Sequence, residues 1–170
     1  TFFTTGNANY VTGSTYVLGA VGLEQAIVTF RKQTDPSGAP LGTTPALLLV
    51  PPELEATANS LYLSDTFNTG GSSSTSKVPN ANVFKGKYKP VVSSYLSNSS
   101  YTGYLTTGYY LLADPRDIAT IQVAFLNGQQ NPTVETADAD FDQLGIQMRG
   151  YFDFGVALMQ YRGGVKVTGA

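Results

Sequence analysis

The stretch Ser14–Lys32, near the start of the chain, has the pattern of one long amphipathic helix. Apolar side chains recur along it at steps of four and three residues, which places them on one helical face: Tyr16, Ala20, Leu23, Ile27 and Phe30. Ser14 or Thr12 can cap its first turn, and Arg31 and Lys32 suit the negative end of the helix dipole. We therefore expect a helix over residues 14–33.

Beside the apolar face runs a second stripe of small residues, Gly19, Gly22 and Ala26. Each glycine inside a helix costs about 1 kcal/mol relative to alanine, so their presence favours a close approach of another backbone. We take Gly19 and Gly22 as candidate contact residues. The alternative is an ordinary core helix in which the glycines are incidental.

The segment Gly145–Tyr161 has the clearest strand pattern in the chain. Apolar side chains alternate with other residues along it, as expected for one face of a strand: Ile146, Met148, Phe152, Phe154, Val156 and Leu158. This length exceeds the usual strand of about 5–6 residues, and Gly150 and Gly155 can mark bends. We expect this strand to pack against the Ser14–Lys32 helix.

Between these two elements the sequence alternates short apolar runs with polar stretches. We expect a second helix from Pro52 to about Leu63, with acidic residues in its first turn. The remaining apolar runs predict strands, the first of them buried on both faces: residues 45–50, 90–96, 109–113 and 118–126. The result is an α+β fold, with the middle of the chain inserted as a second lobe.

Three polar stretches are predicted to be loops: Asp65–Asn82, Ser97–Thr107 and Pro132–Asp142. The first contains Gly70-Gly71 but lacks the lysine and spacing of a phosphate-binding loop. The third has acidic residues at alternate positions, yet it lacks the glycine and the closing glutamate of a calcium-binding EF-hand. We interpret the first two loops, and Thr133–Asp142 of the third, as candidate contacts with neighbouring proteins, and in the second loop we single out Tyr101 and Tyr104.

The basic residues Lys85, Lys87 and Lys89 alternate, which on a strand puts them on one face. A protected edge strand or a contact with an acidic neighbour explains them better than nucleic-acid binding does. We keep Lys85 and Lys87 as candidate contact residues. Arg149 and Asp153 share a face of the final predicted strand and are candidate interface charges, or else a surface ion pair.

Composition argues against an enzyme. The 170 residues include no histidine and no cysteine, so the commonest general base, thiolate catalysis and the usual transition-metal ligands are missing. We predict no catalytic, cofactor-binding or metal-binding residue. The net charge of −2 gives no basic field for nucleic acid, and only 13% of residues are charged while 11 are tyrosine. Such a surface is typical of a protein covered by neighbours.

Four signatures in order give the chain a resemblance to a known family. They are the helix closing on Gln33-Thr34-Asp35, the run Pro45–Ala58, the pair Tyr110–Pro115 and Val123–Gly128, and the segment Gly145–Gly169. Together these resemble the carboxy-terminal part of a tailed-bacteriophage major capsid protein, related to Mu-like head subunits. Some members of that family are fused to a ClpP-like prohead protease.

The resemblance implies the capsid shell fold of tailed-phage heads. In that fold a peripheral domain holds a spine helix and long strands, and an axial domain is inserted into it. The implied division is a peripheral domain over residues 1–45 and 143–170, with the spine helix at 14–33 and the returning strand at 145–161. The axial domain would span residues 46–142.

The implied function is structural: a capsid subunit, of a phage or prophage, that self-assembles into capsomers around the genome. Its partners would be copies of itself in pentamers or hexamers, with packaged DNA only in non-specific proximity and no membrane. Its location would be the virion, or the host cytoplasm during assembly. The alternatives are a fragment of a protease–capsid fusion with a residual hydrolase role, or a tyrosine-rich binding module.

Overall fold

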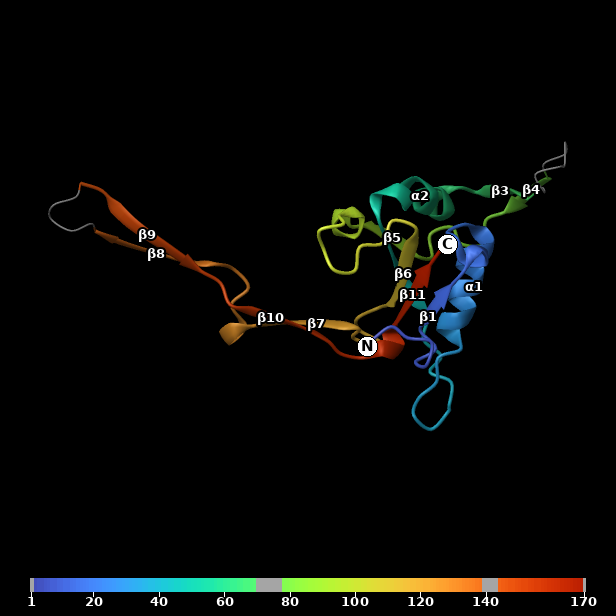
Figure 1. The fold of residues 1–170 in the computed structure, drawn as a ribbon, viewed down its shortest axis with the longest axis horizontal. Helices are drawn as coiled ribbons and strands as arrows, with labels where there is room; N and C mark the ends of the chain where they lie inside the picture. Colours follow the sequence, from blue (N-terminus) through green and yellow to red (C-terminus); the bar gives the residue numbers. More distant parts are fainter. Residues whose placement is uncertain (1, 70–77, 139–143, 170) are drawn as a thin grey trace. The chain divides into compact units, whose positions relative to one another are not determined.

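The computed structural model describes residues 2–69, 78–138 and 144–169, and Figure 1 shows its helices and strands. The chain forms two compact units. We call the first the sheet unit (Thr1–Thr120 with Gln160–Ala170) and the second the hairpin unit (Ile121–Met159). The presence of both helices and sheets is compatible with the expected α+β class. Residues 70–77, within the predicted loop Asp65–Asn82, and residues 139–143, at the end of the predicted loop Pro132–Asp142, lie outside the described residues.

The sheet unit is built on a five-stranded sheet with the order β1-β11-β6-β2-β5. The strands are β1 (Tyr10–Thr12), β2 (Pro45–Val50), β5 (Lys89–Val92), β6 (Gly108–Ala113) and β11 (Gly164–Thr168). The outer pairs β1/β11 and β2/β5 are parallel, and β6 runs antiparallel to both of its neighbours. Residues from both predicted domains, 1–45 with 143–170 and 46–142, therefore share one sheet. That domain division rests on the resemblance and stays a prediction.

Two helices, α1 (Ala20–Arg31) and α2 (Glu55–Leu63), pack on the sheet. Their buried side chains form one core with alternate residues of the central strands: Leu23, Ala26 and Phe30 of α1, Ala58 and Leu61 of α2, and Leu48, Tyr109, Leu111 and Val165 of the sheet. The other face of β2 is only half-buried. The expectation that this strand is buried on both faces is therefore wrong.

Helix α1 is shorter than the sequence predicts. Ser14–Tyr16 is a separate 3-10 turn, and the α-helix begins only after Gly19, whose extended backbone occupies the N-cap position. Neither Ser14 nor Thr12 caps it. The other short 3-10 turns precede or follow strands and α2: Pro52–Leu54, Ser94–Ser97, Leu126–Gly128 and Tyr161–Gly163.

Gly22 lies where α1 meets the chain that leads into it. A Cβ atom built on Gly22 would stand 2.0 Å from the carbonyl oxygen of Val17. The glycine stripe therefore does mark a close backbone approach, but the neighbour is the turn before the helix. Within the sheet unit, α1 packs on β11 and β6. The expected packing of Gly145–Tyr161 against this helix stays a prediction.

Tyr109 ties the sheet to the same helix. Its buried hydroxyl donates a hydrogen bond to the carbonyl oxygen of Gly22 over 3.0 Å. Burial, with a smaller contribution from Tyr16, raises the pKa of the Tyr109 phenol well above its ordinary value. The phenol therefore stays protonated and remains a hydrogen-bond donor.

Two further segments differ from expectation. Lys85 and Lys87 lie in a turn that precedes β5, and only Lys89 lies on that strand, so the three lysines do not share a strand face. The described parts of the Asp65–Asn82 loop include two antiparallel paired strands, β3 (Thr66–Thr69) and β4 (Val78–Ala81).

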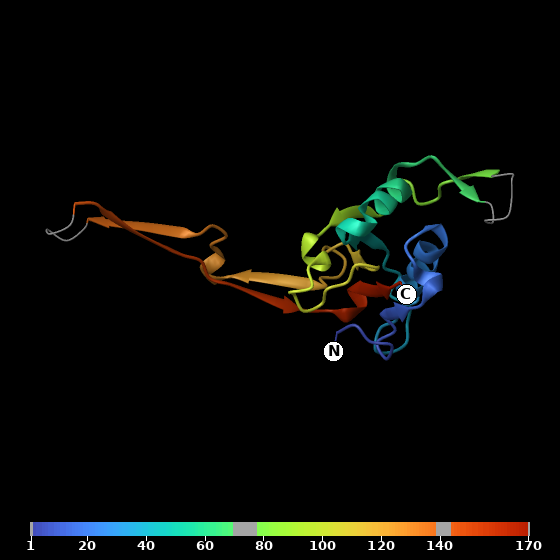
Figure 2. The same cartoon turned by 45° about the horizontal axis from the view of Figure 1, so that its top comes forward.

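The hairpin unit consists of two antiparallel two-stranded ladders that follow one another (Figure 2). The first ladder pairs β7 (Ile121–Phe125) with β10 (Phe154–Leu158). The second pairs β8 (Thr133–Asp138) with β9 (Ile146–Tyr151). The start of the predicted acidic loop is thus a strand, because it finds a partner in β9.

The predicted long strand Gly145–Tyr161 is therefore two strands, broken at Phe152 and Asp153. Opposite the break, the 3-10 turn Leu126–Gly128 leaves the ladder, with left-handed backbone at Asn127 and Gly128. Asn-Gly favours that conformation, so the sequence identified a turn at the correct place. Here the turn interrupts a ladder, whereas an Asn-Gly turn usually closes one.

An exposed ion pair in the sheet unit gives a testable titration. The guanidinium of Arg116 donates to both carboxylate oxygens of Asp114, at 3.0 and 2.7 Å. These bonds lower the pKa of Asp114 from its ordinary 3.8 to about 2. Because the folded-state pKa is depressed, the stabilising contribution is present above pH 3.8 and disappears as the pH falls through about 2.

We expect the Asp114 carboxyl to titrate with a midpoint near 2 in the folded chain, followed by NMR. Arg116→Gln should return the midpoint toward 3.8, since it removes the donor and the charge. A midpoint near 3.8 in the unmodified chain would show that the pair does not form in solution.

Candidate assembly interface

The first ladder of the hairpin unit has one strongly apolar face, which we call the ribbon face. Cross-strand partners pair along it in register, Ile121 with Leu158, Val123 with Val156 and Phe125 with Phe154. Because side chains alternate along a strand, these six point to the same side of the ladder. The opposite side carries small or polar residues: Gln122, Ala124, Gly155 and Ala157.

The ribbon face lacks a core of its own. None of the described residues of the hairpin unit is buried, and Val156, Phe154 and Ile121 are 61%, 58% and 50% exposed. A continuous apolar surface of this kind marks a protein–protein contact when it occurs on a folded protein. An isolated two-stranded ladder is also at best marginally stable in water. Both points make the ribbon face a candidate contact surface.

The second ladder divides its residues in the same way. Glu135 lies directly opposite Arg149, and their side chains form an ion pair at 2.5 Å. The hydroxyl of Tyr151 donates to the same carboxylate over 3.4 Å. On the other side lie Val134 and Met148, both well exposed. The ladder therefore has a polar side and an apolar side.

The charged candidates on the predicted final strand are not brought together. Arg149 pairs with Glu135 of the neighbouring strand, so the alternative of an Arg149–Asp153 surface pair is wrong. Asp153 lies in the break between β9 and β10, where its backbone carbonyl accepts a hydrogen bond from Leu126 over 3.2 Å. Both side chains remain exposed and stay candidates for contacts.

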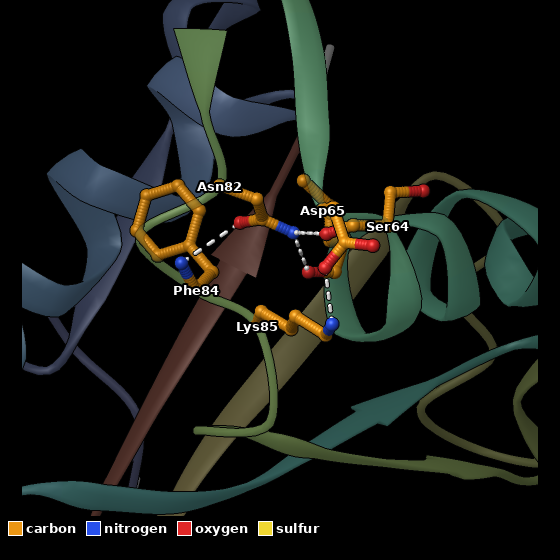
Figure 3. Close-up of polar contacts among 6 residues, drawn as sticks. Ser64, Asp65, Asn82, Phe84 and Lys85 are labelled. Carbon is orange, nitrogen blue, oxygen red and sulfur yellow. Dashed lines mark hydrogen bonds and ion pairs between the residues drawn. The ribbon is translucent and has the colours of Figure 1, made fainter.

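Lys85 and Lys87 are brought together, in the turn that follows β4. Figure 3 shows how Asn82 holds the start of this turn against the end of α2. The side-chain amide of Asn82 donates to the carbonyl oxygens of Leu61 and Ser64, each over 2.7 Å, and its oxygen accepts from the backbone N–H of Phe84 over 2.8 Å. Beside it, Lys85 forms an ion pair with Asp65.

We expect Asn82→Ala to lower the free energy of unfolding by about 3 kcal/mol, because three hydrogen bonds of roughly 1 kcal/mol each are lost from a partly buried site. Urea unfolding followed by circular dichroism measures this. The exposed Asn131 provides a matched control. Equal stability of Asn82→Ala and Asn131→Ala would show that Asn82 does not organise the turn.

The remaining candidates lie in the sheet unit. Tyr101 and Tyr104 lie exposed in the predicted polar loop, and the ring of Tyr101 stacks edge-on against Tyr95 at 5.3 Å. Gly19 is the N-cap of α1, whereas Gly22 is buried against Val17. Gly22 therefore contributes to the fold of this chain, and no surface is left there for a neighbour.

Sequence reasoning missed the ribbon face as a unit. It identified the alternation in residues 118–126 and in 145–161 separately, and it did not pair them. The sequence does contain evidence for this pairing, since both segments place large apolar residues on one side and small or polar residues on the other. Two such segments are expected to pair so that their apolar sides coincide.

The described residues contain neither a metal-ligand cluster nor a membrane-spanning helix. Within residues 2–69, 78–138 and 144–169, no group of three or more metal-ligating side chains comes together. Over the same ranges, no helix has the length and apolar character needed to cross a lipid bilayer.

Comparison with known proteins supplies the class of partner. No match was found among curated proteins. A family model described as "Phage capsid protein" matches residues 1–167, which is almost the whole chain. That family is structural, and its members belong to the virion. The chain belongs to the phage capsid protein family.

Proposed function

We propose that this chain is a capsid subunit that assembles with copies of itself into capsomers enclosing the phage genome. The observation that supports this best is the ribbon face, whose six apolar side chains pair in register across two strands and are not buried in a core. In a shell, the neighbours of a subunit are chiefly other copies of it. A second copy is therefore the natural cover for the ribbon face.

Ring-shaped capsomers, pentamers or hexamers, need contacts between two different surfaces of the subunit, because head-to-tail contacts close into rings. The ribbon face supplies one such surface. The exposed candidates of the sheet unit, Lys85, Lys87, Tyr101 and Tyr104, are suited to the other.

The charge balance fits a subunit that meets DNA only by proximity. Tight binding to duplex DNA requires several phosphates to be neutralised by lysine or arginine. With a net charge of −2, the chain has no overall basic field for that purpose. In this proposal the subunit assembles in the host cytoplasm and ends in the virion.

The test is electron microscopy of the purified chain, together with sedimentation velocity over a range of concentrations. We expect rings, shells or a defined oligomer, with association increasing with concentration. A chain that stays monomeric at every concentration and forms no assembly would contradict the proposal.

A further inference from the structure

The sheet unit carries an apolar groove of about 300 Å³ beside α1. Ile27 and Val28 of the helix form one wall, and Val83, Phe84 and Tyr88 of the turn that Asn82 anchors form the other. Val83 is 61% exposed and Val28 is 41% exposed, whereas Phe84 reaches into the core. We call this the α1 groove. Its walls are large apolar side chains that are partly exposed to solvent.

The rim of the α1 groove is positively charged. Arg31 and Lys32 lie at the end of α1, and Lys87 lies in the opposite wall. These cations outnumber the one carboxylate of the lining, that of Glu24. All four residues are exposed, and no ion pair of the described residues involves any of them. The groove therefore suits a partner surface that is apolar and carries a negative charge.

The hairpin unit presents a surface of that kind, on the apolar side of the second ladder. Val134, Ile146 and Met148 are exposed by 65%, 67% and 71%. Asp138 lies directly opposite Ile146 at the end of the ladder. On the polar side, the negative charge of Glu135 is compensated by its ion pair with Arg149. On the apolar side, the negative charge comes from Asp138.

We propose that the α1 groove of one copy receives the Val134, Ile146 and Met148 side of the second ladder from another copy. Asp138 then faces Arg31, Lys32 and Lys87. The inference rests on the proposed function, which supplies the second copy, and it names the two surfaces that meet. Because the groove and the ladder are different surfaces, the contact is head-to-tail and propagates until a ring closes.

Cysteine cross-linking tests this contact cleanly, since the chain has no cysteine of its own. Val28→Cys is made in one preparation and Ile146→Cys in another that carries a tag, and the two are mixed under mild oxidation. The control partner is Gln147→Cys, one residue away on the opposite side of β9. We expect about tenfold more tagged–untagged dimer with Ile146→Cys than with Gln147→Cys, because a disulfide needs Cα atoms within roughly 7 Å and facing side chains.

The charges give a second readout. Reversing the rim with Arg31→Glu and Lys87→Glu in the Val28→Cys copy should lower the yield of this dimer about tenfold at low salt, equivalent to about 1.4 kcal/mol. Adding Asp138→Lys to the Ile146→Cys copy should restore much of it. A yield of cross-linked dimer that does not change when the rim charges are reversed would overturn the proposal.

The outcomes separate this inference from the proposed function. If sedimentation shows association but Ile146→Cys gives no more cross-linked dimer than Gln147→Cys, the groove contact is wrong and the assembly proposal stands. If the chain never associates, both fail. A disulfide that forms in a Val28→Cys/Ile146→Cys double variant only within single chains also overturns the inference.

Discussion

Replacing Gly22 with alanine is expected to destabilise the chain by at least about 3 kcal/mol, since a buried clash with backbone cannot be relieved by a rotamer change. The new Cβ atom would stand 2.0 Å from the carbonyl oxygen of Val17 and 3.0 Å from the carbonyl carbon of Tyr16. Alanine gains only about 1 kcal/mol in helix propensity over glycine, so the clash dominates. The variant should also lose the hydrogen bond that Tyr109 donates to Gly22 if α1 shifts to make room.

Gly19→Ala is the matched control for this experiment. Its Cβ atom would meet its nearest neighbour at 3.9 Å, an ordinary contact, and its backbone is extended. We expect a loss below about 1 kcal/mol, the difference between glycine and alanine at an N-cap. Urea unfolding followed by circular dichroism gives both values. Similar stability of the two variants would mean that the close approach at Gly22 is absent in solution.

The second large effect concerns the ribbon face. Val123 and Val156 lie directly opposite one another, so Val123→Glu with Val156→Lys puts an opposite-charge pair where two apolar side chains were. Opposite charges at directly opposite positions still favour pairing of the two strands. Burying a valine contributes about 1.5 kcal/mol, so losing two should weaken association about 100-fold or more.

The control places the same two charges on the other side of the ladder. Gln122 lies opposite Ala157, and Gln122→Glu with Ala157→Lys leaves the ribbon face intact. Sedimentation velocity should show the first variant monomeric at concentrations where the control and the unmodified chain associate. Equal association of both variants would show that the ribbon face is not the contact.

Much of the sheet unit could be predicted from sequence because its elements are defined by local patterns. The stripe ending at Phe30 and the run around Leu48 each identify a core element from spacing alone. The start of α1 could not be predicted, since Ser14 looks a better cap than Gly19. The close local packing of Val17 against Gly22 overrides that preference.

The hairpin unit shows where sequence reasoning is weakest. Alternation identified strand character in 145–161, but it cannot say where a strand changes partner. The break at Phe152 depends on the turn at Asn127 in the other strand, which is a long-range relation. The partner of Arg149 depends likewise on the register of β8 with β9. Sequence spacing within one strand suggested Asp153 instead.

The central claim is that another copy covers the ribbon face, and hydrogen exchange at varied protein concentration tests it most directly. A two-stranded ladder with an uncovered apolar face opens readily, so its amides exchange fast. We predict slow exchange of residues 121–125 and 154–158 in the associated state and fast exchange after dilution to monomer. The amides of β6 and β11 should stay protected throughout, because they lie inside a five-stranded sheet. Exchange of the two ribbon strands that is the same in monomer and assembly would contradict the account.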